Sequence, residues 1–446
     1  MKANLSQSWK VLIIFLLSAL AYYYLGYELE RTDFLALVLI FSIPFALYFY
    51  LIKNISNSQI KPFLGMAVLF RILFLFSIPS LSDDYFRFIW DGQLMANGIN
   101  PFDFLPTEVT IDFPNKAMLL TEMNSPNYYS IYPPISQAVF LIGVSLSPNS
   151  ILGSIVVMRL LILLAEIATI LLLPKLLEKL KLSPSKSLIY VLNPLVIIEL
   201  TGNLHFEAFL IFFMVLAFYM LLVKKEKLMG VAWAFAAAVK LIPLLLLPIL
   251  LRKLTFKNAL ISYLLIALTF VGLWFPFYNA NFLNHYFNSL NLYFQSFEFN
   301  AGIYYFIRWL SSFFIEYNPI QRVGPWFSKI ALILILLLLL RKRNQQWNSF
   351  FNSLLFSLSV YFALAIVVHP WYLCTLVFLA VFTNFRYPIL WSAFAILSYY
   401  TYIQANFQES YVLITIEYLA VFSFGSYELW RAKNRKGSNK IETILN

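Results

Sequence analysis

Long apolar runs dominate this sequence and restrict the kind of fold that it can adopt. Many come near the roughly 20 residues that a helix needs to cross a bilayer, and they lie at 11–27, 34–52, 62–78, 151–173, 188–200, 206–223, 260–277, 325–340, 350–368, 371–383, 388–404 and 411–430. They do not alternate polar and apolar residues, as the strands of a membrane barrel do. The chain is 61% hydrophobic, whereas a soluble domain is about half apolar. We therefore predict an all-α protein, a polytopic transmembrane helical bundle of about 11–14 membrane helices.

Basic residues mark one side of this bundle. The positive-inside rule assigns Lys- and Arg-rich loops to the cytoplasm, and such loops occur at the N-terminus, at 53–61, 175–186, 224–227, 252–257 and 341–343, and in a basic cytoplasmic tail at 431–446. Residues 1–430 then form a single integral membrane domain. The net charge of +11 follows from this topology and attracts anionic membrane lipids, so it does not indicate nucleic acid as a partner.

One apolar piece, at 228–251, has basic residues on both flanks, so both of its ends belong on the cytoplasmic side. A broken-helix hairpin satisfies this condition. Its apex is expected near residues 240–243, because Pro243 cannot continue the hydrogen bonds of a helix. The alternative is a straight helix with a buried Lys240. Two more pieces, at 135–146 and 302–314, are expected not to cross the membrane fully.

The first extracytoplasmic loop, about residues 80–134, carries acids that form a candidate active-site edge. Asp83 and Asp84 directly follow an apolar run, and charges at a membrane boundary are costly without a purpose. Aromatic residues at helical spacing over 83–96 predict an interfacial helix in this loop. The alternative interpretation of the acidic cluster is a solvated loop beside a helix end.

Titratable residues from distant parts of the sequence fall on the same outer side. His205, Glu207, His285 and His369 all lie in segments that the lysine pattern assigns to this face. A carboxylate there can act as a general base if it reaches the hydroxyl whose proton it takes.

Several short motifs follow one another along the chain. They are the pair Asp83-Asp84, then Trp90-Asp91-Gly92, Gly98-Ile99-Asn100-Pro101-Phe102, Tyr132-Pro133-Pro134, Gly202-Asn203-Leu204-His205-Phe206-Glu207, Val239-Lys240-Leu241-Ile242-Pro243 and His369-Pro370-Trp371-Tyr372. In this order, over roughly residues 60–385, the sequence resembles the GT-C glycosyltransferases, which use polyprenyl-phosphate-linked sugars. It is most similar to their bacterial and GPI-type mannosyltransferases. Some members of that family have one acid at the first motif where this chain has two.

The resemblance implies a GT-C-like fold and a reaction. A hexose, most often mannose, passes from a polyprenyl-phosphate sugar donor to a lipid or glycan acceptor on the extracytoplasmic face, with inversion at the anomeric carbon. It also implies a multi-pass protein of the bacterial inner membrane. A lipid phosphate is already a good leaving group, so the reaction needs a general base and no general acid.

The resemblance also assigns roles to residues. Asp84 is the expected general base, and Asp83 either orients a sugar hydroxyl or is the base in its place. Other candidates for contact with the donor phosphate or the substrates are Lys240, His369, Arg71, Arg159, Arg308, His205, Glu207 and Tyr132. Arginine suits a phosphate because its planar fork of donors matches the phosphate oxygens.

Structural roles compete with several of these assignments. Arg159 and Glu166 can instead be interior charges bonded to other helices, and His369 can be a capped loop residue. No cofactor is predicted. A divalent metal between the two aspartates stays open, because adjacent aspartates alone are weak evidence for one.

Two other functions compete with sugar transfer. One is a transporter or flippase of a lipid-linked glycan, with charges lining a path through the membrane; such proteins often consist of paired halves, and no internal repeat is evident in this sequence. The other is a non-catalytic partner in an assembly.

Overall fold

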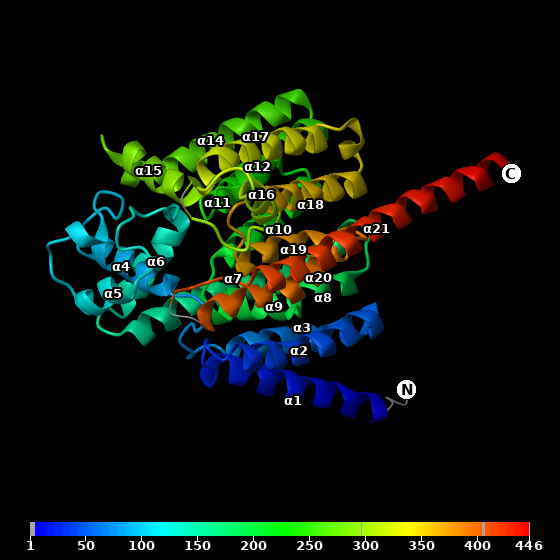
Figure 1. The fold of residues 1–446 in the computed structure, drawn as a ribbon. Coiled ribbons are helices and arrows are strands. Elements are labelled where there is room, and N and C mark those ends of the chain that lie inside the picture. The colour runs from blue at the N-terminus through cyan, green and yellow to red at the C-terminus, as the bar shows by residue number, and fades with distance from the viewer. Residues whose placement is uncertain (1–4, 296, 404–405, 446) are drawn as a thin grey trace.

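The computed structural model describes residues 5–295, 297–403 and 406–445. Over these ranges the regular elements are helices, and one isolated β-bridge joins Phe299 to Val367 (Figure 1). The all-α prediction is therefore confirmed.

Long apolar helices form the body of the molecule. Within the described residues, six helices are long and apolar enough to cross a membrane: α1 (Leu5–Tyr27), α2 (Phe34–Asn54), α7 (Ile151–Lys179), α14 (Phe256–Trp274), α17 (Ile320–Leu339) and α21 (Tyr411–Leu445). They run alongside one another in Figure 1. This arrangement confirms a polytopic helical bundle.

The other predicted spans form shorter helices: α3 (Ile60–Ile72), α8 (Leu188–Val191), α9 (Pro194–Val196), α10 (Glu207–Leu222), α18 (Trp347–Leu364), α19 (Leu373–Ala380) and α20 (Tyr387–Phe394). By length and composition the described residues thus contain six spans, or seven with one bent pair, fewer than the 11–14 that the runs predict. Prolines explain part of the difference. Pro194 begins α9 with no N–H to donate, and the Asn193 side chain caps that helix by accepting from Val196 N at 3.3 Å.

The bent helix pair is interrupted at the motif that holds His205, one of the predicted site residues. Residues Pro194–Gly202 and α10 meet at an angle of 115°, and residues 203–206 form the bend. Leu204 there has a φ of 66°, which a helix cannot contain. Irregular backbone at membrane depth is tolerated only where protein or a wet cavity surrounds it, and all four bend residues are buried.

The predicted hairpin is present. Helix α11 (Glu226–Ala237) ends before Lys240, and the chain continues as α12 (Ile242–Leu246) and α13 (Leu250–Lys253). Asn258 Nδ2, near the start of α14 just after the hairpin, donates to Glu226 Oε1 at 3.3 Å, so the chain has returned to the end at which α11 begins. The alternative of a straight helix is therefore wrong, and Lys240 lies at the apex.

A compact lobe lies at the end of the bundle away from both chain termini (Figure 1). It contains α4 (Asp84–Ala96), α5 (Lys116–Glu122) and α6 (Pro134–Leu146), with α15 (Phe282–Gln295) at the same end. The helix predicted over 83–96 is thus present as α4. It is more enclosed than a helix lying on a membrane surface, because residues 85–94 are all buried.

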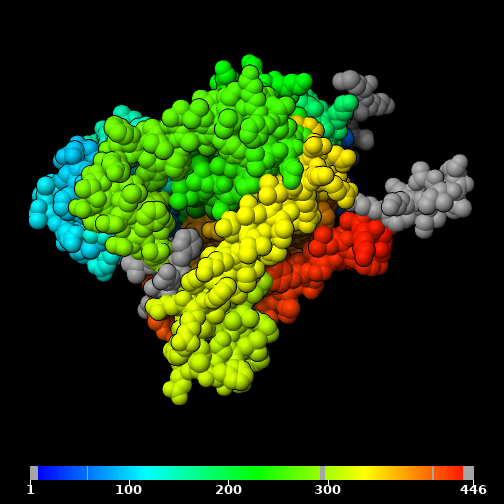
Figure 2. Space-filling view, turned by 90° about the horizontal axis from the view of Figure 1, so that it is seen from above, coloured from blue at the N-terminus to red at the C-terminus, as the bar shows by residue number. Residues whose placement is uncertain are grey.

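The two remaining pieces of uncertain topology are short helices. The run at 135–146 belongs to α6, and the run at 302–314 contains α16 (Gly302–Ser311), which has 10 residues. Neither meets the length needed to cross a bilayer. Figure 2 shows α16 and α17 (yellow-green to yellow) as a ridge along one face, with α16 projecting beyond its neighbours.

Gly92 permits the close crossing of α4 and α6. A Cβ atom at this position would lie 2.6 Å from the carbonyl oxygen of Phe140 and 2.8 Å from Val144 Cγ2. We expect Gly92→Ala to lower the free energy of unfolding by about 1–3 kcal/mol, because the helix backbones must move apart. Thermal unfolding of the purified protein measures this.

Gly65 provides the matched control. It also lies within a helix, but no atom elsewhere in the described chain lies within 4 Å of a Cβ built there. Gly65→Ala should leave stability unchanged or raise it by up to about 1 kcal/mol. Equal effects of the two substitutions would show that the α4–α6 crossing is not tight.

Candidate active site

The two adjacent aspartates at the start of α4 have different environments. Asp83 accepts hydrogen bonds from Arg31 Nη1 at 2.7 Å on both of its carboxylate oxygens. Arg31 comes from the loop between α1 and α2 and also lies 4.9 Å from the centroid of the Tyr402 ring. Asp83 is therefore held in a salt bridge that ties the lobe to the bundle.

Asp84 forms no salt bridge within the described residues. Its side chain accepts a hydrogen bond from Asn124 Nδ2 at 2.9 Å. Burial raises the pKa of Asp84, and the positive potential of His205, the Asn124 hydrogen bond and Lys240 offset part of that rise. A raised pKa makes the ionised carboxylate a better proton acceptor near neutral pH.

Lys240, at the hairpin apex, faces the start of α10. Its ammonium group pairs with the Glu207 carboxylate and lies 3.9 Å from the centroid of the Tyr372 ring. The Lys240 side chain keeps 30% of its surface exposed. The ion pair and the ring fix the direction of the ammonium group without enclosing it, which leaves room for an anion.

Two histidines stack on one tryptophan. The rings of His205 and Trp371 lie 3.8 Å apart and those of His369 and Trp371 lie 4.3 Å apart, both nearly parallel. His205 Nδ1 donates to the carbonyl oxygen of Glu199 at 2.9 Å. Its Nε2 is buried without a hydrogen-bond partner among the described residues, so it is available to a ligand.

His369 is kept uncharged. Burial lowers its pKa well below the ordinary value, and the positive potentials of Lys240 and His205 lower it further. The backbone before it is fixed by the bridge to the 299 segment, in which Val368 N donates to the carbonyl oxygen of Phe299 at 2.8 Å. A neutral imidazole can donate one hydrogen bond and accept another.

Tyr132 lies beside this group. Its ring packs edge-on against Phe88 at 5.1 Å and against Phe140 at 5.5 Å. Both of those rings also contact Phe206, which lies between His205 and Glu207 in the sequence. Tyr132 therefore helps to join α4 and α6 to the bend that carries the site.

Arg71 and Arg159 lie elsewhere, fully buried in the bundle. Arg71 Nε donates to Glu166 Oε2 at 2.8 Å. Arg159 donates to four backbone carbonyls, which belong to Leu75, Ser77, Thr201 and Gly202. These contacts favour the structural alternative for both arginines, which the sequence left open beside a role at the donor phosphate. Arg159 fixes the backbone just before the bend.

Arg308 also has a partner, because it pairs with Glu298 on the segment before α16. A metal site finds no added support: the described residues contain no group of three His, Cys, Asp or Glu side chains that could hold an ion. Asp83 already binds Arg31 through both oxygens.

Three contributors to the site were not predicted from the sequence. Arg31 had a usable signal, since it is a basic residue on the side that the lysine pattern leaves acidic. Asn124 and Glu199 had none, because an amide in a loop and a glutamate in an apolar run do not reveal their partners. Trp371 and Tyr372 were already part of the His369 motif.

A comparison with known proteins assigns the chain to a family. A family model described as alpha-(1->6)-mannopyranosyltransferase, N-terminal domain, matches residues 27–255, more than half of the 446-residue chain. The matched range contains both aspartates, His205, Glu207 and Lys240. No curated protein and no solved structure matches the chain significantly. The six long apolar helices among the described residues indicate a multi-pass membrane protein, and the chain belongs to the alpha-(1->6)-mannopyranosyltransferase family.

Proposed function

We propose that this protein transfers mannose from a polyprenyl-phosphate donor to a hydroxyl group of a lipid or glycan acceptor, with inversion at the anomeric carbon and with Asp84 as general base. The observation that carries the proposal is the contrast between the two aspartates. Asp83 is neutralised by Arg31, whereas Asp84 has no salt bridge to any described residue and lies near His205 and Lys240, both of which lower its pKa.

The bonds and charges balance with these groups. Asp84 takes the proton of the acceptor hydroxyl as its oxygen attacks the anomeric carbon. The bond from that carbon to the phosphate oxygen breaks, and the leaving polyprenyl phosphate keeps the electron pair. Lys240, oriented by Glu207, faces the growing negative charge, and preorganised cations at such a position commonly supply large rate factors.

The histidines complete the pocket in this proposal. His205 Nε2, buried and without a partner among the described residues, binds a donor oxygen. His369, kept neutral beside Lys240, donates to the phosphate or to a sugar hydroxyl. Trp371 holds both rings parallel and limits their rotation.

The extracytoplasmic face is the side that the charge pattern supports. The lobe with Asp84 lies opposite both termini (Figure 1), and the basic residues of the loops assign the termini to the cytoplasm. We propose the bacterial inner membrane as the location. A polyprenyl-phosphate donor fits that face, since its sugar is carried across on the lipid.

Reconstituted transfer tests the function. Purified protein in liposomes is supplied with polyprenyl-phosphate mannose, the corresponding glucose donor and an oligomannoside acceptor, and the products are separated by mass. We expect mannose to be added in α-(1→6) linkage. Movement of the donor between leaflets without any product would instead support a flippase, and direct use of a nucleotide-linked mannose would refute the proposed donor.

The pH dependence should report the ionisation of Asp84. Only the carboxylate form accepts a proton, so kcat/KM should fall as pH drops through the pKa of Asp84, which burial raises above the ordinary value of about 3.9. Asn124→Ala removes a hydrogen bond that lowers this pKa and should move the acid limb to higher pH. Asn127→Ala, an exposed amide in the same loop, should leave the limb in place. An identical limb in all three proteins would exclude Asp84 as its source.

A further inference from the structure

Two half-buried lysines lie at the end of the bundle opposite the candidate active site. Lys186 Nζ donates to the carbonyl oxygen of Thr383 at 3.2 Å and to Asn384 Oδ1 at 3.3 Å. Lys253 Nζ donates to the carbonyl oxygen of Gln345 at 2.7 Å and lies 3.4 Å from the centroid of the Trp347 ring. Neither lysine forms a salt bridge with an acid in the described part of the chain.

A cavity of about 270 Å³ opens beside Lys186, and Lys253 contacts Trp347, one of the residues that line it. We name it the lysine pocket. One wall is apolar and consists of Leu180, Leu182, Phe351 and Phe382. The other four lining residues carry nitrogen in their side chains: Lys186, Trp347, Asn348 and Asn384. The pocket thus combines hydrogen-bond donors and a cation with a hydrocarbon surface.

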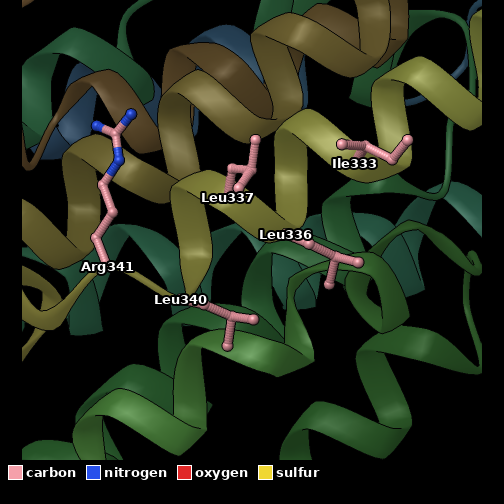
Figure 3. A pocket seen from close by; sticks show the side chains of 5 residues that line it. All are labelled: Ile333, Leu336, Leu337, Leu340 and Arg341. Atoms are coloured by element: carbon pink, nitrogen blue, oxygen red, sulfur yellow. The ribbon is translucent and has the colours of Figure 1, made fainter.

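A second cavity at this end lacks that combination. It measures about 320 Å³ and is lined by Ile333, Leu336, Leu337, Leu340 and Arg341. Figure 3 shows Leu336 and Leu340 pointing to one side of α17, whereas the Arg341 side chain extends to the other. The single polar side chain of this lining points away from Leu336 and Leu340, so this cavity has no built site for an anion.

Neither Lys186, in the pocket, nor the nearby Lys253 has an acidic partner among the residues that the structure describes. Burial lowers the pKa of Lys186 to about 8, with a contribution from nearby Arg386, and burial lowers the pKa of Lys253 to about 8. Desolvation of an ammonium group without an acidic partner is unfavourable. An anion in the pocket would remove that cost, and oxygen atoms of a phosphate are strong acceptors for such donors.

The surroundings of the lysine pocket indicate which kind of phosphate would bind there. The pocket lies at the end of α7, a helix long enough to cross the membrane, and farther along that helix Leu164 and Leu171 are exposed as a lipid-facing surface. A free phosphate would gain nothing from four apolar side chains. A phospholipid can set its phosphate against Lys186 and its glycerol and first acyl carbons against the apolar wall.

We propose that the lysine pocket binds the phosphate headgroup of an anionic phospholipid in the leaflet at this end of the bundle. Charge complementarity selects the anionic class, because a zwitterionic headgroup would bring a second positive charge beside Lys186 and Arg386. The site is separate from the mannosyltransfer chemistry, so it does not depend on the donor or the acceptor.

Lipid binding to the purified full-length protein tests this site. Dioleoylphosphatidylglycerol and dioleoylphosphatidylcholine are titrated in detergent, and bound lipids are counted by native mass spectrometry. We expect phosphatidylglycerol to bind at least about ten-fold more tightly than phosphatidylcholine, and Lys186→Gln to remove about that factor, since one charge-assisted hydrogen bond is worth roughly this much. Lys186→Arg should retain the preference.

Three further measurements keep the proposal falsifiable. Lys175→Gln removes the same charge from an exposed position on α7 and should bind phosphatidylglycerol as the unaltered protein does. If Lys186→Gln does not fold, Asn348→Trp decides: it keeps the lysine and fills the pocket, and must also lose binding. Undiminished binding by either pocket variant overturns the proposal. Displacement of phosphatidylglycerol by equimolar inorganic phosphate would identify a free-anion site instead.

Discussion

Replacing Asp84 by asparagine is expected to lower the rate of mannosyl transfer by about 10²–10⁴-fold, the usual contribution of a positioned general base. The amide is nearly the same size and can still bond to Asn124, which donates to this side chain at 2.9 Å, but it cannot take a proton. Donor affinity should persist, because Lys240 and the two histidines are unchanged. Single-turnover transfer and equilibrium donor binding, measured on the same preparation, separate the two effects.

Asp83→Asn is the matched control, one residue away. It removes the charge that binds Arg31 in a partly exposed salt bridge, so it should cost on the order of 1 kcal/mol of stability and reduce transfer far less than Asp84→Asn does. Loss of transfer in Asp83→Asn together with activity in Asp84→Asn would exchange the roles of the two acids.

The second large effect concerns the interior of the bundle. Glu166→Gln is expected to lower the free energy of unfolding by about 3–5 kcal/mol, because it leaves the buried guanidinium of Arg71 without its counter-charge. Both side chains have no exposed surface. Glu166 also accepts from the hydroxyl group of Tyr190 at 2.6 Å. The reaction of Cys374, the single and buried cysteine, with a thiol dye on heating reports unfolding.

Two further variants identify the cause of this loss of stability. Glu178→Gln removes an exposed acid from the same helix and should change stability little. Arg71→Met combined with Glu166→Leu removes both charges, and such replacements are often close to neutral. If the double variant is as unstable as Glu166→Gln, shape and the Tyr190 bond, not the unpaired charge, account for the effect.

Sidedness is what made much of the site predictable. His205, Lys240 and His369 are far apart in the sequence, yet the lysine pattern put the two histidines on the outer face and Lys240 at the apex of a hairpin, and the structure brings all three to one place. The residues that contact them also belong to these motifs. Glu207 and Tyr372 contact Lys240, and Trp371 stacks on both histidines. The hairpin at Lys240 was predictable for the same reason, since only a turn at 240–243 keeps both basic flanks on one side.

Partners across helices were not predictable. A sequence shows that Arg71 is a charge in an apolar run but does not show that Glu166, 95 positions later, will meet it. Arg71 lies in the short helix α3 and Glu166 in the long helix α7, without a spacing that links them. The number of long spans was overestimated for a related reason: apolar composition does not reveal where Pro194 and the bend at 203–206 divide a run.

The stack of His205 and His369 on Trp371 joins two parts of the sequence that lie far apart. His205 belongs to the portion that the family model matches, which ends at residue 255, whereas His369 and Trp371 lie beyond it. In the proposed mechanism the acid therefore comes from one part of the chain and one wall of the pocket from another. A substitution at His369 or Trp371 can reshape that wall while Asp84 and Lys240 stay as they are.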